Sequence, residues 1–239
     1  MKTYAPDYYT SFRCIADKCR HTCCKGWEID IDEISLQRMK KIPDISKHIQ
    51  FDDTPHIILN GDESCPFLNA RGLCDMILTH GEDMLCDICR DHPRFRNFWS
   101  DRIEIGLGLV CEEAARIILS SPTPLKLIEI ENDGVDDALP DDEKWLLDYR
   151  DDLLANITAE GCRARLLEYL IYRHIPDALY DDRLEQRVSF VYSAYDELIG
   201  KWEKTSGTLD DLIEICRVFS YDVEYDDEVL EEYIENEGK

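Results

Sequence analysis

The chain has 239 residues, of which 44% are apolar and 10% aromatic, so it can bury the core of one domain or of two closely packed ones. Its formal net charge is -25, and residues 122–239 carry most of it. An acidic surface repels phosphate groups, so we expect neither a nucleic acid nor an anionic membrane as a partner.

The chain contains eleven cysteines, and in a reducing compartment these need an explanation other than disulfides. The first residues lack the apolar stretch of a secretory signal, and no run approaches the ~18 apolar residues of a membrane span. We therefore expect a cytoplasmic protein with reduced thiols. Cys162 and Cys216 lie on apolar helix faces and are expected to pack in the core, which leaves the other nine to explain.

Residues 1–121 are predicted to form a cysteine-cluster metal-binding region of short elements joined by loops. Apolar residues alternate with polar ones where strands are expected and recur at helical spacing elsewhere. In chain order, the predicted elements are a short helix in Ile15–Cys24, a strand over Trp27–Ile31, a helix over Ile34–Lys41 capped by Asp30 or Asp32 and ending at Pro43, a strand over His56–Leu59, a strand over Arg102–Leu109 and a helix over Cys111–Leu119.

Residues 122–239 are predicted to form an acidic helical region, which begins after a boundary near Ser120–Pro124. Apolar residues recur at i, i+3, i+4 and i+7 in each predicted helix. These helices are Lys144–Ile157, Arg163–His174, Glu185–Trp202, Leu209–Phe219 and a last one within Val223–Ile234. The expected fold is mostly α, with short irregular or β elements around a metal centre in the first half, and the two regions are either separate or one continuous domain.

The densest cysteine group is Cys14-x4-Cys19-x3-Cys23-Cys24. In a helix, Cys19 and Cys23 would lie one turn apart on the same face, with Cys14 near enough to join them.

Five more cysteines follow in pairs or singly. Cys65 and Cys74 flank a turn-prone stretch, and Cys86-x2-Cys89 has metal-ligand spacing. Cys111 begins a predicted helix, whose dipole lowers the pKa of a thiol.

These nine cysteines indicate a site for a soft metal. Clustered thiolates repel one another unless a cation neutralises them, and sets of sulfur ligands select zinc or iron–sulfur clusters. The spacing matches neither a zinc ribbon nor a ferredoxin, and nine thiols can supply up to two four-ligand sites. Disulfides and plain core packing are the alternatives. His21 and His92 are more readily explained as solvated or supporting histidines than as ligands.

Four motifs of this chain resemble the flagellin lysine-N-methylase family, within the wider group of zinc- or iron-chelating cysteine-cluster proteins. They are F-x-C-x4-C-x3-CC-x-GW (Phe12 to Trp27), CPFL…GLC (Cys65 to Cys74), GEDxLxxxCRxxPR (Gly81 to Arg94) and E-x-GLGLVCEEAARIIL (Glu104 to Leu119). The second half adds three further stretches with family counterparts. They are Trp145–Leu154, Tyr169–His174 and Phe219–Tyr233.

The resemblance implies an S-adenosylmethionine-dependent lysine N-methyltransferase that acts on flagellin. It also implies a Cys-ligated iron–sulfur cluster of the 4Fe–4S type, with zinc as the alternative metal. The family's cysteines fall on Cys14, Cys19, Cys23, Cys24, Cys65, Cys74, Cys89 and Cys111, and Cys86 is an addition of this chain.

Methylation requires a site that binds a sulfonium and an ammonium and removes a proton from lysine. Catalytic candidates are Tyr169, Tyr172 and His174 beside Arg173, although the two tyrosines also suit the core face of a helix. Arg94 is a candidate for holding a cofactor carboxylate, or else for an ion pair within the fold. No glycine-rich fingerprint for adenosine is present in the sequence.

Two other function classes stay open. One is a non-catalytic zinc- or iron-chelating cysteine-cluster protein, which needs only the cysteines. The other is a scaffold with a structural metal, whose acidic helical region binds a partner.

Overall fold

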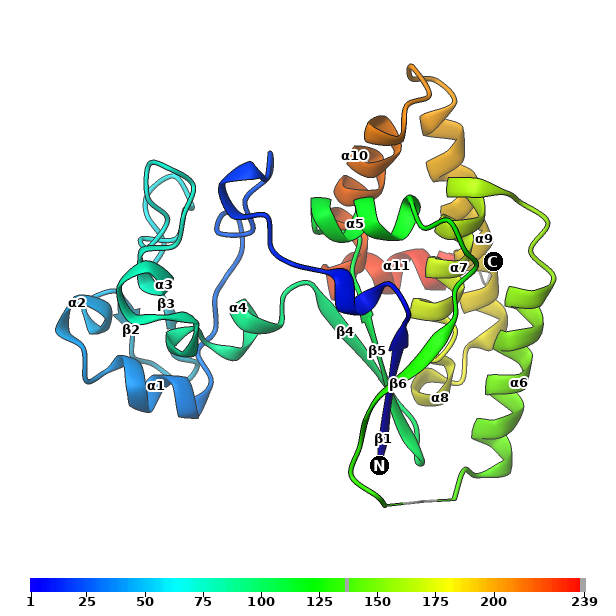
Figure 1. Ribbon diagram of the computed structural model, residues 1–239, viewed down its shortest axis with the longest axis horizontal. Coiled ribbons are helices and arrows are strands. Elements are labelled where there is room, and N and C mark those ends of the chain that lie inside the picture. Colours follow the sequence, from blue (N-terminus) through cyan, green and yellow to red (C-terminus); the bar gives the residue numbers. More distant parts are fainter. Residues whose placement is uncertain (136–137, 237–239) are drawn as a thin grey trace. The chain divides into compact units, whose positions relative to one another are not determined.

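The computed structural model describes residues 1–135 and 138–236, and these fold into two compact units (Figure 1). The cysteine unit is Cys14–His92, and the helical unit combines Met1–Arg13 with Pro93–Lys239. This division differs from the predicted regions 1–121 and 122–239, because the first strand of the chain pairs with a strand that follows His92. The cysteine unit is therefore an insertion in the chain of the helical unit.

The helical unit contains a four-stranded mixed sheet in the order β4-β5-β1-β6. Its strands are β1 (Lys2–Pro6), β4 (Arg94–Phe98), β5 (Arg102–Leu107) and β6 (Leu127–Asn132). Strand β1 runs parallel to β5 and antiparallel to β6, and β4 is antiparallel to β5. Only β5 lay within a predicted strand, over Arg102–Leu109, and that prediction is confirmed.

Strand β5 is the most buried part of the sheet, and the packing around two of its residues limits which amino acids can occupy these positions. Glu104 is fully buried and forms an ion pair with Arg150, whose side chain is also buried. A Cβ atom added at Gly106 would lie 2.3 Å from the Phe95 ring. Gly106 therefore serves packing within the sheet, where any larger residue would force Phe95 to move.

Among the described residues, the helical unit contains six longer helices and one short one. They are α5 (Glu112–Leu119), α6 (Asp141–Ala155), α7 (Gly161–His174), α8 (Ala178–Asp181), α9 (Leu184–Trp202), α10 (Leu209–Phe219) and α11 (Asp227–Asn236). A π-helical turn, Ser220–Glu224, joins α10 to α11. The five helices predicted for this part of the chain are confirmed, with ends that differ by a few residues.

The core of the helical unit forms around α7, which is buried along most of its length. Helix α7 packs against α5, α6 and α9. Cys216 is fully buried in this core, and Cys162 is half-buried against it. The expectation that these two cysteines serve packing is thus confirmed.

The cysteine unit is built from short elements and loops. They are α1 (Glu33–Met39), α2 (Pro43–Ser46), β2 (Ile49–Gln50), β3 (His56–Ile57), α3 (Asp75–His80) and α4 (Asp87–Asp91). The Asp32 carboxylate accepts a 2.8 Å hydrogen bond from the Ser35 amide and caps α1, as predicted. Residues 27–31 form a single bridge, Asp30 with His56, in place of the predicted strand.

The helix predicted in Ile15–Cys24 is wrong. Only a 3-10 turn forms, over Ala16–Lys18, and it begins with Ala16 at a φ of +50°, which no α-helix contains. Cys19 then takes an extended conformation and ends the turn. The placement of Cys19 and Cys23 on one helix face therefore does not hold.

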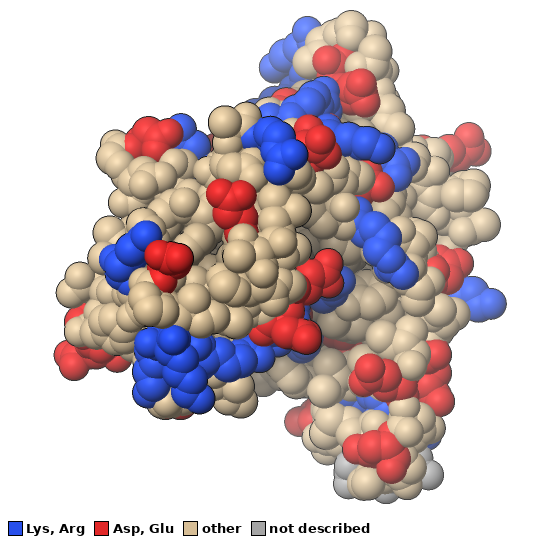
Figure 2. All heavy atoms as spheres, turned by 60° about the vertical axis from the view of Figure 1, so that its left-hand side comes forward, with Lys and Arg blue, Asp and Glu red and all other residues tan. Residues whose placement is uncertain are grey.

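The surface mixes charges of both signs. On the face shown in Figure 2, lysine and arginine side chains lie in several places, with a large group at the lower left, and acidic side chains are spread between them. Among the described residues, no helix has the length and apolar character to cross a membrane.

Candidate functional site

Five cysteines come together in the apolar core of the cysteine unit, and we call them the thiol group. Cys65 and Cys86 are buried in this core, and Cys24, Cys74 and Cys89 are partly buried against it. Three separate sequence segments supply them. All five belong to the nine that the sequence predicts as metal ligands.

Local structure holds each segment of the thiol group in place. The Cys65 amide donates a 2.8 Å hydrogen bond to the Cys24 carbonyl. Cys74 is bridged to Leu68, and it also occupies the N-cap of α3. Cys86 is the N-cap of α4, which places Cys89 within that helix.

Asp32 links the elements around these cysteines. One carboxylate oxygen caps α1, and the other accepts a 2.9 Å hydrogen bond from the Asp87 amide at the start of α4. A single side chain therefore fixes α4, and with it Cys86 and Cys89, to α1.

The thiols influence one another electrostatically. Burial, with smaller contributions from the nearby Cys24, Cys74 and Cys86, raises the pKa of Cys65 to about 12, although a hydrogen bond from the Phe67 amide opposes this rise. Burial also raises the pKa of Cys74, against the amides of Ile77 and Met76. Charges on several of these thiols are therefore unfavourable together unless a cation compensates them.

Two thiol pairs are joined by hydrogen bonds. The bond with Cys23 lowers the pKa of Cys24 to about 7. The bond between Cys86 and Cys89 lowers the pKa of Cys86 and raises that of Cys89. One thiol of each pair therefore has a lowered pKa, which favours the thiolate form that binds metals.

The chemistry of the thiol group fits a soft metal. Within residues 1–135 and 138–236, no three His, Cys, Asp or Glu side chains take up the geometry of a metal site. The donors nevertheless share one buried neighbourhood, and backbone amides of following residues lower the pKa of Cys65, Cys74 and Cys86. Buried sulfur donors with amide support are what a zinc or iron–sulfur centre uses.

The other four predicted ligands lie outside this core. Cys14 and Cys23 are exposed, and Cys19 is half-exposed and donates a 2.6 Å hydrogen bond to the His21 carbonyl. Cys111 belongs to the helical unit, where it is the N-cap of α5, as the sequence predicts. Their role as metal ligands stays a prediction. No disulfide forms among the eleven cysteines, all of which lie within the described residues.

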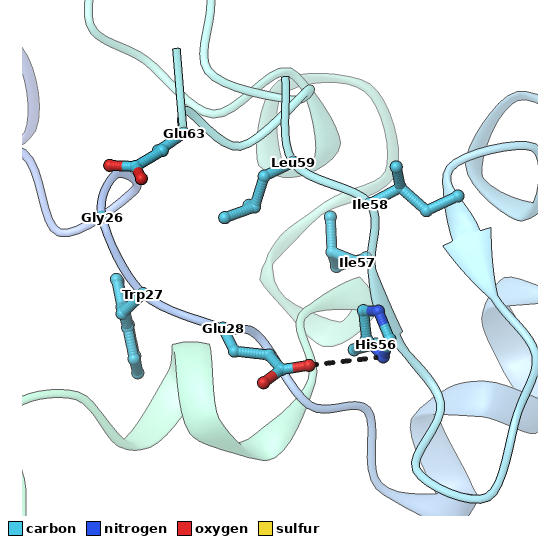
Figure 3. Close-up of a pocket in the computed structure, with 8 residues that line it drawn as sticks. All are labelled: Gly26, Trp27, Glu28, His56, Ile57, Ile58, Leu59 and Glu63. Atoms are coloured by element: carbon cyan, nitrogen blue, oxygen red, sulfur yellow. Dashed lines mark ion pairs between the residues drawn. The ribbon is translucent and has the colours of Figure 1, made fainter. Parts of the chain in front are cut away.

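A hollow lies in the cysteine unit between residues 26–28 and residues 56–63, and we call it the cysteine-unit hollow (Figure 3). Its volume is about 360 Å³, and its lining residues are Gly26, Trp27, Glu28, His56, Ile57, Ile58, Leu59 and Glu63. The His56 ring forms an ion pair with Glu28 at 3.5 Å. The sequence did not predict this site, although Gly26 and Trp27 end the first cysteine motif.

The catalytic candidates Tyr169, Tyr172 and His174 all lie in α7 of the helical unit, and each exposes only 1% of its surface. Tyr169 donates a 2.8 Å hydrogen bond to Glu224, and the Tyr172 hydroxyl bonds to the Ile105 carbonyl. This arrangement favours the alternative that the two tyrosines are core residues. A substrate role for the three stays a prediction.

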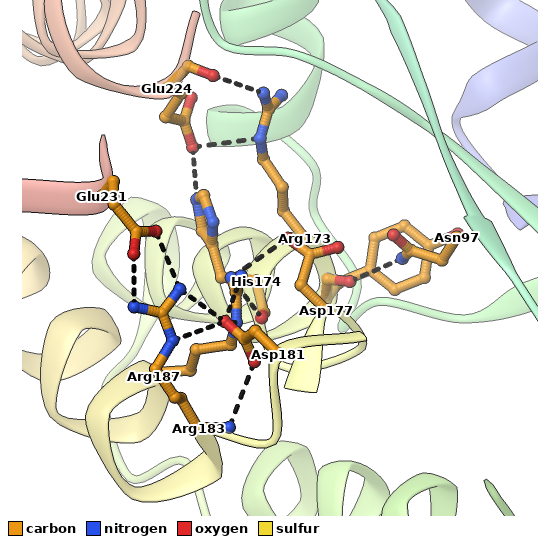
Figure 4. Close-up of polar contacts among 10 residues, drawn as sticks. Asn97, Arg173, His174, Asp177, Asp181, Arg183, Arg187, Glu224 and Glu231 are labelled. Atoms are coloured by element: carbon orange, nitrogen blue, oxygen red, sulfur yellow. Dashed lines mark hydrogen bonds and ion pairs between the residues drawn. The ribbon is translucent and has the colours of Figure 1, made fainter. Parts of the chain in front are cut away.

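Glu224, in the π-helical turn, is the centre of a buried polar network (Figure 4). The His174 Nε2 atom lies 2.7 Å from one carboxylate oxygen, and Arg173 forms an ion pair with the same oxygen at 3.4 Å. Phe95 and Tyr225 lie against the Arg173 guanidinium at 4.9 and 5.1 Å. Arg173 and His174 were expected near a substrate site, but their shared partner Glu224 was not predicted.

Arg94, the cofactor candidate, lies at the start of β4. Its Nε atom donates a 2.8 Å hydrogen bond to the Tyr9 hydroxyl, and its guanidinium lies over the rings of Tyr9 and Phe12. These contacts hold the N-terminal segment against β4, and a role in binding a carboxylate stays a prediction.

A second hollow, of about 600 Å³, lies in the helical unit. Leucines of β6 and α6 line it together with Tyr4, Arg102, Lys144, Asp148 and Arg150. Its charged side chains pair with one another or with neighbours, as Lys144 does with Asp148. The sequence did not predict it.

Comparison with curated proteins confirms the resemblance that the cysteine motifs suggested. The chain is 29% identical over 138 residues to proteins named lysine-N-methylase from Salmonella typhimurium and Salmonella choleraesuis. It is 25% identical over 136 residues to the flagellar biosynthetic protein FliU of Salmonella muenchen. Each match covers 52% of this chain, but 34% of the two methylases and 80% of FliU. No protein-family model and no solved structure matches the chain.

Proposed function

We propose that this chain takes part in the methylation of flagellin lysines with S-adenosylmethionine as the methyl donor. The observation that carries the proposal is the similarity to proteins named lysine-N-methylase and FliU. The chain matches about a third of the length of these methylases, so the activity of a whole methylase is part of the proposal.

We further propose that the thiol group holds a metal centre, with an iron–sulfur cluster as the first candidate. Cys24, Cys65, Cys74, Cys86 and Cys89 are the residues that would supply its ligands, because they share one buried neighbourhood. When bound, such a centre supplies positive charge that compensates the thiolates, and an open iron position would bind the amine and carboxylate of a methionine moiety.

The reaction itself is a displacement. The neutral lysine amine attacks the methyl carbon, the new C–N bond forms as the C–S bond breaks, and the bonding electrons pass to sulfur. The lysine must lose one proton in the process, so the site needs carboxylates or a histidine near the ammonium.

The test is a methylation assay with the full chain purified without oxygen. We expect transfer of labelled methyl groups from S-adenosylmethionine to lysines of purified flagellin, detected by mass spectrometry of its peptides. Cys65→Ser should abolish transfer, and Cys162→Ser, outside the thiol group, should retain it. Metal-loaded protein that transfers no methyl group would contradict the proposal.

Such a result would favour the second candidate, a non-catalytic metal-chelating protein. The observation in favour of this candidate is that the thiol group lies within a unit that has its own apolar core. Bound metal without methyl transfer is the outcome that it predicts.

A further inference from the structure

The cysteine-unit hollow arises from a mismatch between two segments of chain. Residues 25–30 and 56–64 are bridged at one end by Lys25 with Ser64 and at the other by Asp30 with His56. Between these bridges the first segment has fewer residues than the second, so pairing cannot continue and the two segments separate. The hollow of about 360 Å³ opens at that point.

The walls of the hollow combine an aromatic ring, apolar side chains and two carboxylates. Trp27 lies on one side and Leu59 on the other, and Glu28 and Glu63 come from opposite segments (Figure 3). The Trp27 ring is held by a 2.5 Å hydrogen bond from Nε1 to the Cys23 carbonyl. Its position is therefore set before any ligand arrives.

The electrostatic environment of the hollow is negative. Its lining contains two glutamates against a single histidine, His56. A hydrogen bond to the Thr54 carbonyl raises the pKa of His56, and the carboxylates of Asp52, Glu28 and Asp30 add to this effect. The nearest lysine, Lys25, pairs with Asp62. Such surroundings favour a cationic ligand.

We infer that this hollow binds the alkylammonium end of the substrate lysine. The inference rests on the proposed function and adds a place for its substrate. An ammonium in the hollow would gain from the Glu63 carboxylate, from Glu28, which also pairs with His56, and from the Trp27 ring. The methylene groups of the lysine would lie along the apolar wall at Leu59.

The hollow also lies beside the thiol group along the same two segments. The Cys65 amide bonds to the Cys24 carbonyl, and two residues further along the Gly26 amide bonds to the Glu63 carbonyl at 3.1 Å. A lysine bound in the hollow would therefore lie near the segments that carry Cys24 and Cys65.

The experiment is a titration of the full chain followed by nuclear magnetic resonance at the tryptophan indole N–H groups, with Trp27→Phe to assign the Trp27 signal. The probe is Nα-acetyl-lysine-N-methylamide, and the neutral comparison is the same compound acetylated at Nε. We expect the charged probe alone to shift the Trp27 signal in a saturable way. Glu28→Gln and Glu63→Gln should each weaken binding by about fivefold.

Glu82→Gln is the matched control, because Glu82 is an exposed glutamate of the same unit that does not line the hollow. Its affinity should equal that of the unchanged chain. Equal shifts with the neutral probe, no shift with either probe, or unchanged affinity in Glu28→Gln and Glu63→Gln would overturn the inference. A response to acetate in place of the lysine probe would do the same.

The titration contains neither S-adenosylmethionine nor flagellin, so its result is independent of methyl transfer. If the lysine probe binds as expected but flagellin is not methylated, the proposed function fails and the hollow remains a lysine site. If flagellin is methylated equally well by Glu28→Gln and Glu63→Gln, the hollow is overturned and the proposed function stands.

Discussion

Glu224 shows how one buried side chain organises the helical unit. It lies in the π-helical turn, contacts Tyr169, Arg173 and His174 of α7, and is fully buried. Burial by itself raises the pKa of a carboxyl group, but the Arg173 charge and the His174 hydrogen bond reverse this and lower the pKa of Glu224 to about 2. At neutral pH the Glu224 carboxylate is therefore charged, and its contacts with Arg173 and His174 stabilise the fold.

Replacing Glu224 should remove a pH-dependent contribution to stability. Because its pKa is about 2 in the folded chain and near 4.3 in an unfolded one, the contribution is present above pH ~4.3 and is lost as the pH falls toward 2. We expect Glu224→Gln to lower the free energy of unfolding by about 3 kcal/mol at pH 7, and by much less near pH 2. Urea unfolding at both pH values measures this.

The control for this prediction is Glu231→Gln. Glu231 also pairs with an arginine, Arg183, but its side chain is 48% exposed. We expect little change in stability. A loss in Glu224→Gln that is the same at pH 2 and pH 7 would contradict the account of its charge.

At this scale the sequence predicted the chemistry of single residues better than their partners. The chemistry of clustered thiols predicted Cys65 and Cys86 as metal ligands, and the structure places both in one apolar core. Glu224 was not found, because its contacts with α7 join positions about 50 residues apart, and no local pattern reveals such a pairing. Trp27 and His56 were named only as parts of predicted strands and of a motif, because the hollow that they line joins two segments that are distant in sequence.

Among the secondary-structure elements, amphipathic helices were predicted well and short elements were not. Helices α7, α9 and α10 bury one face in a large core, so apolar residues recur in their sequences at helical spacing. Strands β1, β4 and β6 were missed. They are five or six residues long, and their pairing joins distant parts of the chain. In residues 15–24 local hydrogen bonds form a 3-10 turn, and the periodicity of the sequence does not predict this turn.

Asp32 allows a prediction at the level of elements, since it caps α1 and also holds the start of α4. We expect Asp32→Ala to destabilise the cysteine unit by about 1–2 kcal/mol, because two helix starts lose an acceptor. Hydrogen exchange followed by mass spectrometry should show faster exchange in both α1 and α4.

The comparison variant for Asp32 is Asp44→Ala, which removes an exposed acid from the first turn of α2. Exchange in α1 and α4 should not change in it. Faster exchange confined to α1 in Asp32→Ala would show that the contact with Asp87 does not hold α4.

At the scale of the whole molecule, the two compact units are interleaved in sequence. The pairing of β1 with β5 joins Lys2 to Arg102 across the entire cysteine unit. A change in cysteine content or charge along the chain could not reveal this. The boundary predicted near Ser120–Pro124 marks instead the end of α5 inside the helical unit.

Because each unit has its own core, we expect a metal chelator to destabilise the cysteine unit and to leave the helical unit folded. The helical unit has a large core of its own, and the cysteine unit has a small one that includes thiols. We expect chelation to abolish protection from hydrogen exchange in α3 and α4, because metal binding contributes to folding. Protection in α7 and α9 should remain. Equal losses in both units, or none in either, would contradict this view.

The central claim is that the thiol group holds a metal, and metal content with an absorption spectrum tests it most directly. The full chain should be purified without oxygen, together with Cys65→Ser and, as control, Cys162→Ser. We predict about four iron atoms per chain, with visible absorption that bleaches on reduction. Cys65→Ser should lose both signals, and Cys162→Ser should keep them. One or two zinc ions without visible absorption would favour the chelating alternative, whereas a chain without bound metal, or with metal that Cys65→Ser does not affect, would contradict the claim.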